Sequence, residues 1–338
     1  MPRRILADRP TTMADVARRA GVAAITVSRA LSNPAQVSAA TLARIQRAIA
    51  ESGYVRHALA GSLASNATRC IGVVVPVLSN SIFADTLQGL SEVFEEQGYR
   101  LLIACSQYDP LREQRIVEAF IGQRVDGIAL TGVTHSGPTR AMLARARIPV
   151  VQMWNLPTRP LDCAVGFSNF DAARAMVRHL FSRGYRRIAY IGGLTYKNDR
   201  TQARERGYRQ GLAEAGLRVK ESHVRRTPFE FENGAAALSD LIETDPSIDA
   251  VFAASDVLAV GALLHCLRRG WPVPRKVALA GLDGSPIGAL IKPELTSIRF
   301  PRHQIGVRSA ELLLDRIRGR AAGVVEDLGF ELIAGGSA

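Results

Sequence analysis

The sequence predicts a small all-α N-terminal domain followed by a larger, doubly wound α/β domain with two lobes. The first 56 residues contain three short amphipathic segments separated by turn residues. From residue 69 onward, short apolar runs alternate with helical segments that end in glycine, which is typical of parallel sheets with helical crossovers. Seven of these runs have the length of a strand, and that number suits two sheets better than one.

Positive charge is concentrated near the N-terminus. Residues 1–69 contain ten arginines, no lysine and three acidic residues, whereas the formal net charge of the whole chain is +12. A basic segment of this kind is typical of proteins that bind a polyanion, because each neutralised phosphate releases condensed counterions. A solvated basic surface without a partner is the alternative. The positions of individual residues distinguish these two interpretations.

Several classes of protein are disfavoured by motifs that the sequence lacks. No run approaches the roughly 18 apolar residues of a membrane span, and residues 1–10 carry three arginines without the apolar stretch of a secretory signal. We therefore expect a cytoplasmic protein with no membrane partner. The four cysteines are far apart and form no CxxC pair, so no zinc site or disulfide framework is expected. Because nucleotide-binding glycine motifs and HExxH are also missing, we predict no catalytic residue, no metal, no cofactor and no enzyme activity.

The first two helices are predicted from a cap, an apolar stripe and a glycine. Thr12 and Asp15 form a capping pair before the stripe, and Gly21 ends the first helix. A second helix over residues 24–31 buries apolar residues spaced three and four apart. Its opposite face then presents Ala24, Ile25, Ser28 and Arg29.

A third helix is expected to begin at Ser38, after the turn at Asn33 and Pro34, and to end before Gly53. Three short helices with a tight glycine turn between the first two form a helix-turn-helix, whose second helix enters the major groove of DNA. The polyanion partner of the basic segment is therefore predicted to be double-stranded DNA.

Residues 13–54, MADVARRAGVAAITVSRALSNPAQVSAATLARIQRAIAESGY, resemble the DNA-binding headpiece of the LacI/GalR repressors. The resemblance assigns to base edges the same set that helical periodicity selects, namely Ala24, Ile25, Ser28 and Arg29. Arg29 is the best candidate for a bidentate contact with guanine, and the resemblance makes Thr26 and Ser38 phosphate-contacting hydroxyls. Position 23 departs from the family, because alanine replaces the serine that usually caps the recognition helix.

Residues 57–68 correspond to the hinge helix of this family. The run HALAGSLASN has helix-forming residues but also a glycine and few apolar partners, so we expect it to fold only when DNA and a second subunit order it. By resemblance, Leu63 inserts into the minor groove and bends the duplex. An ordinary linker is the alternative, and Arg56 and His57 replace the Pro-Asn pair usual before the hinge helix.

The larger domain, residues 69–338, is expected to bind an effector and to dimerise. Its seven predicted strands lie within residues 70–77, 100–105, 125–132, 148–154, 187–193, 250–255 and 277–283. The family has the two-lobed, doubly wound fold of periplasmic binding proteins. The resemblance implies a headpiece of residues 1–56, an N-lobe of residues 69–167 and 299–325, and a C-lobe of residues 168–298 and 326–338.

Candidate effector contacts follow the predicted strands, because ligands of doubly wound folds bind at the carboxyl ends of strands. Ser79 and Asn80 follow the first strand, where they either cap the next helix or hydrogen-bond a ligand. Asn155 follows the fourth run and is a candidate partner for a ligand hydroxyl. Ser255 and Asp283 end two later runs, and a carboxylate such as that of Asp283 accepts hydroxyl protons.

Two arginines favour an acidic effector. By resemblance, Arg204 stands at the position whose arginine holds the effector in this family, and Arg200 lies one turn earlier on the same helix face. Two guanidiniums in a cleft favour a carboxylate or phosphate, which accepts the arginine fork bidentately. A charged, solvent-exposed face is the alternative. Phe229 matches the aromatic platform of the family, Phe83 is expected to form a wall of the cleft, and the resemblance ranks Asp283 above Asp256 as a ligand contact.

Residues 164–174, 262–274 and 327–338 are similar to the gluconate-utilisation repressors of the family. The resemblance implies a repressor of sugar-acid metabolism genes that binds a pseudo-palindromic operator as a homodimer and responds to gluconate or a related aldonate. Gluconate, a keto-gluconate and a phosphorylated gluconate stay open as effectors. Two alternative functions also stay open, a two-lobed sugar-binding protein and a LacI-type regulator of a neutral sugar.

Overall fold

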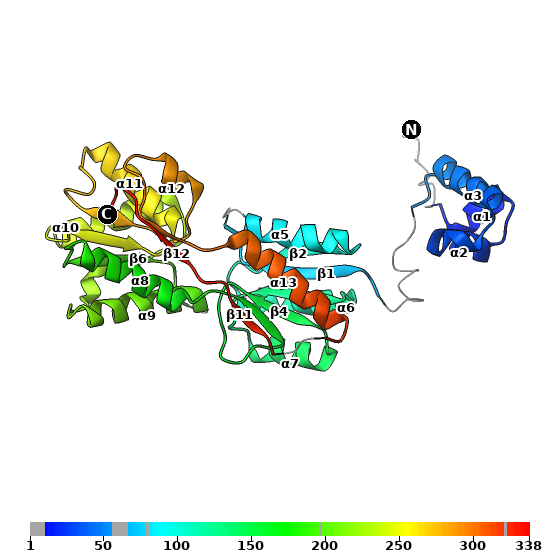
Figure 1. The fold of residues 1–338 in the computed structure, drawn as a ribbon, viewed down its shortest axis with the longest axis horizontal. Coiled ribbons are helices and arrows are strands. Elements are labelled where there is room, and N and C mark those ends of the chain that lie inside the picture. Colours follow the sequence, from blue (N-terminus) through cyan, green and yellow to red (C-terminus); the bar gives the residue numbers. More distant parts are fainter. Residues whose placement is uncertain (1–10, 56–66, 79–81, 197, 321–322) are drawn as a thin grey trace, which may run out of the picture. The chain divides into compact units, whose positions relative to one another are not determined.

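The computed structural model describes residues 11–55, 67–78, 82–196, 198–320 and 323–338, and the chain forms two compact units, Met1–Thr68 and Arg69–Ala338 (Figure 1). Three of the predicted site residues, Leu63, Ser79 and Asn80, lie outside the described residues. The described residues contain no helix that is both long and apolar enough to cross a membrane.

The N-terminal unit contains the three helices that the sequence predicts. They are α1 (Met13–Ala20), α2 (Ala24–Ser32) and α3 (Ala39–Ser52), with a short 3-10 turn, η1 (Pro34–Gln36), before α3. Asp15 caps α1 by accepting hydrogen bonds from the backbone N–H (3.0 Å) and the hydroxyl (2.7 Å) of Thr12. Gly21 ends this helix with a left-handed backbone (φ 62°). The apolar faces of the three helices meet in a small core of Val16, Ala17, Ala20, Val27, Ala30, Ile45, Ala48 and Tyr54.

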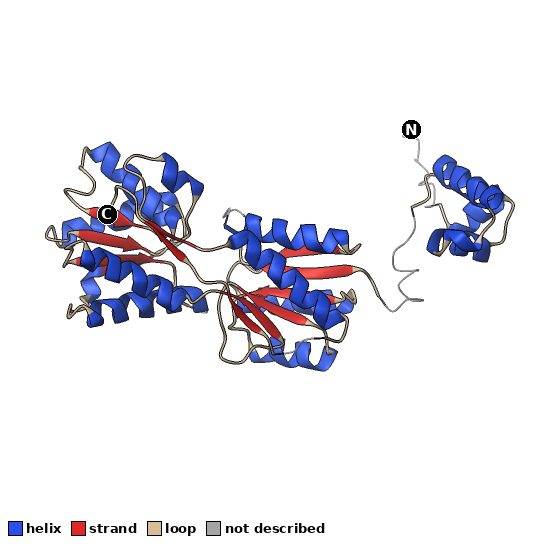
Figure 2. Ribbon diagram, in the orientation of Figure 1, coloured by secondary structure: helices blue, strands red, loops and turns tan. Residues whose placement is uncertain are grey.

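The second unit has two parallel sheets, one in each lobe (Figure 2). The N-lobe sheet has the strand order β11-β5-β4-β3-β1-β2. Its strands are β1 (Cys70–Val75), β2 (Arg100–Cys105), β3 (Gly127–Thr131), β4 (Val150–Met153), β5 (Cys163–Gly166) and β11 (Val325–Asp327). One face is covered by α5 (Ile82–Glu96) and α13 (Arg302–Ile317), and the other by α6 (Pro110–Gly122) and α7 (Gly137–Ala146).

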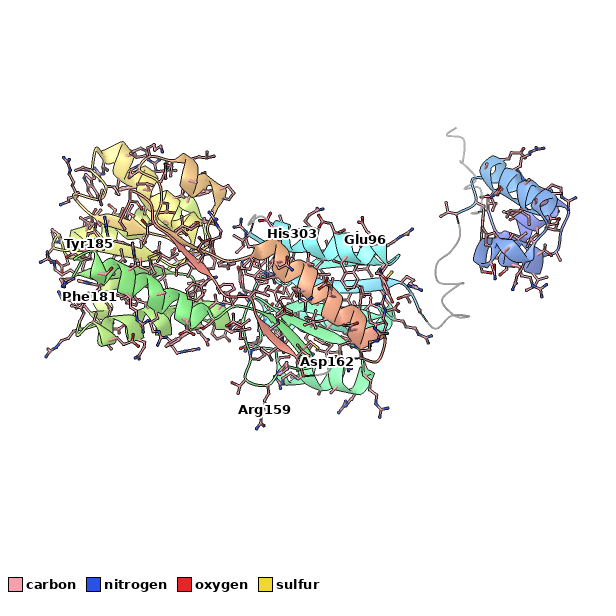
Figure 3. All side chains as sticks on the ribbon, viewed as in Figure 1. Glu96, Arg159, Asp162, Phe181, Tyr185 and His303 are labelled. Atoms are coloured by element: carbon pink, nitrogen blue, oxygen red, sulfur yellow. The ribbon has the colours of Figure 1, made fainter. Side chains whose placement is uncertain are left out.

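Helix α13 is attached to the N-lobe although the strand before it, β10 (Ser297–Arg299), leads out of the C-lobe. Buried apolar residues such as Leu313 pack it on the sheet. At its first turn His303 contacts Glu92 of α5 (2.8 Å), and near its last turn Arg316 pairs with Asp162 before β5 (2.6 Å); His303 and Asp162 are labelled in Figure 3. Exposed ion pairs contribute little, so the apolar contacts dominate the stability of this attachment.

The C-lobe sheet has the strand order β7-β6-β8-β9. Its strands are β6 (Ile188–Gly192), β7 (Val224–Arg226), β8 (Ala250–Ala253) and β9 (Ala278–Ala280). One face packs against α8 (Asn169–Ser182) and α9 (Asp199–Glu214), and the other against α10 (Phe231–Thr244) and α11 (Asp256–Arg269). Two short elements complete this lobe, the 3-10 turn η2 (Glu221–His223) and the helix α12 (Pro286–Leu290).

Three segments connect the two lobes. The first joins β5 to α8, the second joins β10 to α13, and the third joins β11 to β12 (Glu331–Ile333), which pairs with β10 in antiparallel orientation. Phe167 of the first segment stacks on Phe300 of the second, with ring centroids 4.1 Å apart. Trp154, which follows β4, meets Phe300 edge-on at 5.3 Å. The connections are therefore held together by an aromatic cluster at the base of the cleft.

The predicted fold class is confirmed, and each of the seven predicted strands is present. The strand over residues 100–105 has the predicted bounds, and the other six are shorter than predicted. Five further strands, β5, β7, β10, β11 and β12, were not predicted. Each has three or four residues, which is too short for the periodicity of an isolated segment to reveal a strand. They exist because neighbouring chain segments supply hydrogen-bond partners.

The close contact between α8 and α9 predicts a steric effect at Gly207. A Cβ at this position would lie 2.1 Å from the carbonyl oxygen of Phe170. We expect Gly207→Ala to destabilise the protein by about 1–3 kcal/mol because the helix backbones must separate, and to lower the Tm by at least about 2 °C in thermal unfolding followed by circular dichroism. Gly122→Ala is the matched control, since a Cβ on this α6 residue meets no atom within 4 Å. Equal melting temperatures for the two variants would contradict the steric argument.

Candidate functional site

The recognition helix α2 places the predicted base-facing residues on its outer side. Ala24, Ile25 and Arg29 are exposed, while Ser28 and Thr26 are half-buried. Ile25 is a large apolar side chain that is 59% exposed. An exposed apolar side chain beside an arginine suits the thymine methyl groups and guanine edges of the major groove.

The starts of α2 and α3 differ in how they are capped. Ser38 is exposed and begins α3, where its Oγ accepts the backbone N–H of Thr41 (3.4 Å) and its hydroxyl donates to Thr41 Oγ1 (3.0 Å). Ala23 precedes α2 and supplies no side-chain cap. The first backbone N–H groups of α2 are therefore left to solvent or to a phosphate oxygen.

The effector domain has a small cavity of about 20 Å³ between its lobes. This volume is far below the range of about 300–1,000 Å³ typical of ligand pockets, so the lobes are closed on each other and have to move apart to admit a ligand. Six predicted effector contacts line it: Phe83, Arg200, Arg204, Phe229, Ser255 and Asp283. Five further residues complete the lining: Ile82, Tyr108, Trp154, Asn198 and Thr201.

Arg204 is the most deeply buried cation of this cavity, with 4% of its surface exposed. Its Nε donates to Asn169 Oδ1 (2.8 Å), and its Nη1 donates to the carbonyl oxygen of Ala254 (2.7 Å). Asp283 Oδ1 lies 3.6 Å from the same Nη1. Burial lowers the pKa of Arg204, and the carboxylate of Asp283 opposes this shift. The guanidinium is thus fixed in one orientation by groups of the C-lobe.

The two carboxylate oxygens of Asp283 differ in their hydrogen bonds. Its Oδ2 accepts hydrogen bonds from the Ser255 hydroxyl (2.8 Å) and the backbone N–H of Asp256 (3.1 Å). Its buried Oδ1 accepts no hydrogen bond from any described residue. Burial raises the pKa of Asp283, and Arg204 opposes this shift. Asp283 therefore offers a free acceptor in the cavity, where a hydroxyl can donate.

Asp256 lies behind Asp283 and does not line this cavity. Its carboxylate accepts hydrogen bonds from the Ser297 hydroxyl (2.6 Å) and from the backbone N–H of Ser285 (2.5 Å). Burial, and then the neighbouring charge of Asp283, raise the pKa of Asp256 to about 7. Asp256 thus joins α11 to the segments around α12 and β10, which is a structural role.

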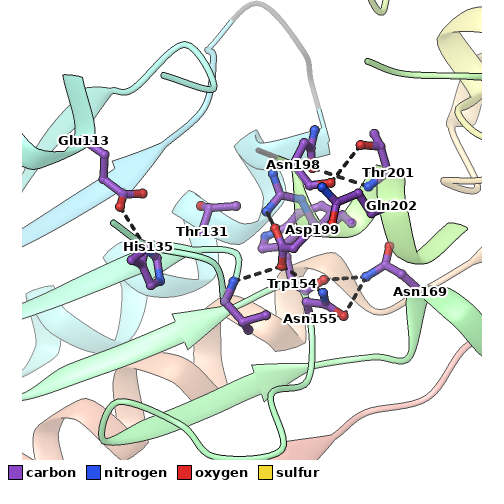
Figure 4. A network of polar contacts seen from close by, with 12 residues as sticks. Glu113, Thr131, His135, Trp154, Asn155, Asn169, Asn198, Asp199, Thr201 and Gln202 are labelled. Carbon is purple, nitrogen blue, oxygen red and sulfur yellow. Dashed lines mark hydrogen bonds and ion pairs between the residues drawn. The ribbon is translucent and has the colours of Figure 1, made fainter. Parts of the chain in front are cut away.

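Asn155 does not line the cavity, and its amide is engaged in a contact between the lobes (Figure 4). Its Nδ2 donates to Asp199 Oδ2 (2.8 Å), which also accepts the backbone N–H of Val133 (2.9 Å). Asp199 begins α9 in the C-lobe, whereas Val133 and Asn155 follow strands of the N-lobe. Arg200 Nη1 lies 3.4 Å from Asp199 Oδ1. The same carboxylate therefore joins the lobes and contacts an arginine of the cavity.

Three of the seven non-glycine residues with positive φ in the described chain line the cavity. They are Tyr108 (φ 58°), Trp154 (φ 76°) and Asp283 (φ 149°). Such backbone conformations cost energy and concentrate at functional sites. The indole Nε1 of Trp154 is buried and has no hydrogen-bond partner among the described residues, so it is a free donor.

Several residues of the cavity and of the lobe contact were not predicted from the sequence. Tyr108 and Trp154 each follow the end of an N-lobe strand, which is the same signal that selected Asn155. Asn169 and Asp199 begin α8 and α9, where a polar residue is typical of a helix start. Their position after a strand marks Tyr108 and Trp154 as candidates, but nothing in the sequence distinguishes Asn169 and Asp199 from ordinary first-turn residues.

The cavity combines charge, polar groups and aromatic surface. Arg200 and Arg204 supply positive charge, the indole of Trp154 supplies a free donor, and Asp283 supplies a free acceptor. The ring of Phe229 forms part of the wall. A small anion with several hydroxyl groups complements this set of groups.

Comparison with protein-family models matches both units of the chain. Residues 12–57 match the model described as "Bacterial regulatory proteins, lacI family". Residues 177–338 match the model described as "Periplasmic binding protein-like domain". The two matches thus fall in the helical headpiece and in the α/β domain.

Relatives and solved structures extend the likeness over nearly the whole chain. The HTH-type transcriptional regulator GntR of Escherichia coli (strain K12) is 40% identical over 324 residues, covering 96% of this chain and 97% of the relative. The crystal structure of transcription regulator GntR from Chromobacterium violaceum is 36% identical with a TM-score of 0.75, covering 79% of this chain and 98% of that one. A LacI-family regulator from Silicibacter pomeroyi is 30% identical with a TM-score of 0.90, covering 97% and 99%.

Substitutions that swap the side chains of Asn155 and Asp199 test the contact between the lobes. Asn155→Asp places two carboxylates together, and we expect it to destabilise the protein by about 1–3 kcal/mol, since a buried polar contact becomes repulsive. The double variant Asn155→Asp/Asp199→Asn removes the repulsion, because only one carboxylate remains at the contact. We expect it to recover only part of the lost stability, because Asn155 and the Val133 N–H share Asp199 Oδ2 and one amide at position 199 cannot both donate and accept there. Urea unfolding of the wild type, both single variants and the double variant measures the coupling. Additive single effects would show that the two side chains do not interact.

Proposed function

Because this chain belongs to the LacI family of bacterial regulatory proteins, we propose that a small sugar acid, gluconate or a related aldonate, controls its binding to operator DNA from the cavity around Arg204. The chain is a DNA-binding transcriptional regulator with a helix-turn-helix headpiece, and it is not an enzyme. The observation that carries the effector proposal is the pair of arginines in a closed cavity, where the described residues use only part of the hydrogen-bonding capacity of the two guanidiniums.

The chemistry of the cavity supports an aldonate over a neutral sugar. A carboxylate accepts charge-assisted hydrogen bonds from Arg200 and Arg204, which are stronger than those between neutral groups. A hydroxyl group of the aldonate donates a hydrogen bond to Oδ1 of Asp283, and the Trp154 indole donates to another ligand oxygen. The ring of Phe229 packs on the apolar C–H face of the same chain. The similarity of residues 164–174, 262–274 and 327–338 to gluconate-utilisation repressors supports the same choice.

Operator recognition follows from the headpiece and from symmetry. A homodimer presents two α2 helices to a pseudo-palindromic operator, because a twofold axis in the protein requires one in the DNA. Ala24, Ile25, Ser28 and Arg29 contact base edges, Thr26 and Ser38 contact phosphates, and Leu63 enters the minor groove. The protein acts in the cytoplasm, where its operator and a metabolic acid are both available.

Effector and operator are linked through the lobes. An aldonate in the cavity changes the contacts of Arg200 with Asp199, and Asp199 joins the N-lobe to the C-lobe. The lobes then favour an arrangement in which the hinge segments of the dimer cannot pair on DNA. Coupling of this kind amounts to about 1–3 kcal/mol and is reciprocal, so operator DNA weakens effector binding by the same factor.

Substitution of Arg204 tests the effector site. We expect Arg204→Gln to weaken gluconate binding by about 10- to 100-fold, because hydrogen bonds to an ionised group are lost, while operator affinity without effector is retained. Isothermal titration with gluconate, 2-ketogluconate, 6-phosphogluconate and glucose, together with fluorescence anisotropy on labelled operator, measures both quantities. Arg206→Gln is the control, since Arg206 lies on the same helix but is exposed. Tighter binding of glucose than of any acid would overturn the choice of an aldonate.

Substitution of Arg29 tests the recognition helix. We expect Arg29→Ala to cost about 1–3 kcal/mol of operator affinity and to relax the preference for one symmetry-related G·C pair in the operator. The operator is obtained by selecting bound fragments from random DNA, and the preference is measured on single-base variants of it. Arg44→Ala removes an exposed positive charge from α3 and is the control, expected to weaken binding uniformly. An unchanged base preference in Arg29→Ala would remove Arg29 from direct readout.

A further inference from the structure

The cleft of the effector domain contains a second, larger cavity beside the one that holds the arginines. Its volume is about 800 Å³, against about 20 Å³ for the first cavity. Its walls are mostly apolar, with exposed side chains such as Leu194 (54%) and Tyr196 (76%). The first cavity is lined by buried polar residues, including Arg204 (4%) and Asp283 (1%). We call the first the inner cavity and the second the outer cavity, because the second opens to solvent.

Three residues, Tyr108, Asn198 and Phe229, line both cavities and so form their boundary. Tyr108 follows β2 in the N-lobe, and Phe229 follows β7 in the C-lobe. Their ring centroids are 6.5 Å apart, and the ring planes are inclined by 45°. This aromatic pair therefore reaches across the cleft at the point where the inner cavity meets the outer one.

The turn that carries Tyr108 is fixed by its backbone. Gln107 and Tyr108 are both left-handed, with φ of 53° and 58°. Hydrogen bonds from Gln107 N–H to the Pro76 carbonyl (2.8 Å) and from Asp109 N–H to the Ser106 carbonyl (2.9 Å) hold the turn. Two consecutive residues with this strained backbone are unusual and indicate a functional demand on the direction of the ring.

The ring of Phe229 is positioned by a glycine at the end of β6. A Cβ on Gly193 would lie 2.2 Å from Cζ of Phe229, so any other residue there displaces the ring. Phe229 also packs against the apolar core of α10, α11 and the C-lobe sheet. The turn around Tyr108 therefore fixes one ring of the pair, and Gly193 and the C-lobe core fix the other.

We propose that Tyr108 is a specificity-determining residue that separates the two cavities, so that the effector site accepts an acid with a single sugar chain and rejects one that carries a second sugar. This inference rests on the proposed function, because it takes an aldonate as the ligand of the inner cavity. The inner cavity has a volume of only about 20 Å³, so the lobes have to part to admit even one sugar chain. A second sugar ring on that chain has to extend past the aromatic pair of Tyr108 and Phe229 into the outer cavity. Rejection by a steric clash is a common source of specificity.

The hydroxyl of Tyr108 is within electrostatic range of three charged residues that line the inner cavity, Arg200, Arg204 and Asp283. Burial raises its pKa, while the positive charges of Arg200 and Arg204 oppose the shift and the negative charge of Asp283 adds to it. The phenol therefore stays neutral at physiological pH and donates a hydrogen bond to a ligand oxygen. The ring excludes a second sugar, and the hydroxyl adds one donor to the site for the acid.

The left-handed backbone of Tyr108 provides a variant that removes the ring without adding strain. Glycine adopts φ near 58° at no steric cost, so Tyr108→Gly is expected to fold. It joins the inner and outer cavities into one continuous space, with the arginines at one end and apolar walls at the other. Tyr108→Phe keeps the ring and removes only the hydroxyl. Tyr196→Ala is the control, because Tyr196 lines the outer cavity alone.

Isothermal titration of the full-length protein with gluconate and with lactobionate tests the proposal. Lactobionate is a gluconate chain that carries one additional sugar ring, so the pair differs only in the part that meets the boundary. We expect the wild type, Tyr108→Phe and Tyr196→Ala to bind lactobionate at least about 100-fold more weakly than gluconate, and Tyr108→Gly to bind the two within about 10-fold of each other. Circular dichroism of each variant checks the fold.

The outcomes separate the boundary from the site itself. If the wild type binds both acids equally, or if Tyr108→Gly binds gluconate but discriminates as strongly as the wild type, Tyr108 does not set the size of the ligand. If Tyr196→Ala raises the affinity for lactobionate as much as Tyr108→Gly does, Tyr108 does not form the boundary. If the wild type binds neither gluconate nor lactobionate, the proposed function is wrong, and the inference about Tyr108 is wrong with it.

Discussion

Burial of the Arg204 guanidinium is the constraint on which the effector domain depends. A buried cation is tolerated only where its N–H groups and its charge are compensated. Asn169 at the start of α8, Ala254 after β8 and Asp283 after β9 provide this compensation. All three partners belong to the C-lobe, and close packing of α9 against α8 at Gly207 brings Asn169 to the arginine. The charged part of the cavity is therefore assembled within one lobe, and the N-lobe supplies mainly aromatic walls.

The compensation of Arg204 continues into the contact between the lobes. Asn169 accepts the Arg204 Nε with its oxygen, and its Nδ2 donates to the carbonyl oxygen of Trp154 (2.8 Å) and lies 3.5 Å from the oxygen of Asn155. Asn155 in turn donates to Asp199, which binds the backbone of the N-lobe. One polar network thus orders the guanidinium and joins the lobes. A ligand that takes over the free N–H groups of the arginines acts on the same network that sets the lobe arrangement.

The parts that sequence predicts are those specified locally. Helices α1 to α3 carry their own caps and apolar stripes, and the central strands are apolar runs, so both are recognisable without partners. Strands such as β10 and β12 exist only because distant segments pair, and no local pattern marks them. In the cavity, the ends of long strands and a family likeness point to Arg204, Ser255 and Asp283. Tyr108 depends on a left-handed turn, which its residue type does not indicate.

Charge balance in the cavity gives a reason for an acidic ligand. Asp283 approaches Arg204 at 3.6 Å without a hydrogen bond, and its other oxygen is engaged by Ser255 and by the backbone of Asp256. Asp199 already accepts two N–H donors when it meets Arg200 at 3.4 Å. Each arginine therefore has a carboxylate nearby, but among the described residues no carboxylate binds its guanidinium in the bidentate geometry that arginine favours. A ligand carboxylate can provide that geometry, whereas a neutral hydroxyl provides neither the charge nor the paired acceptors.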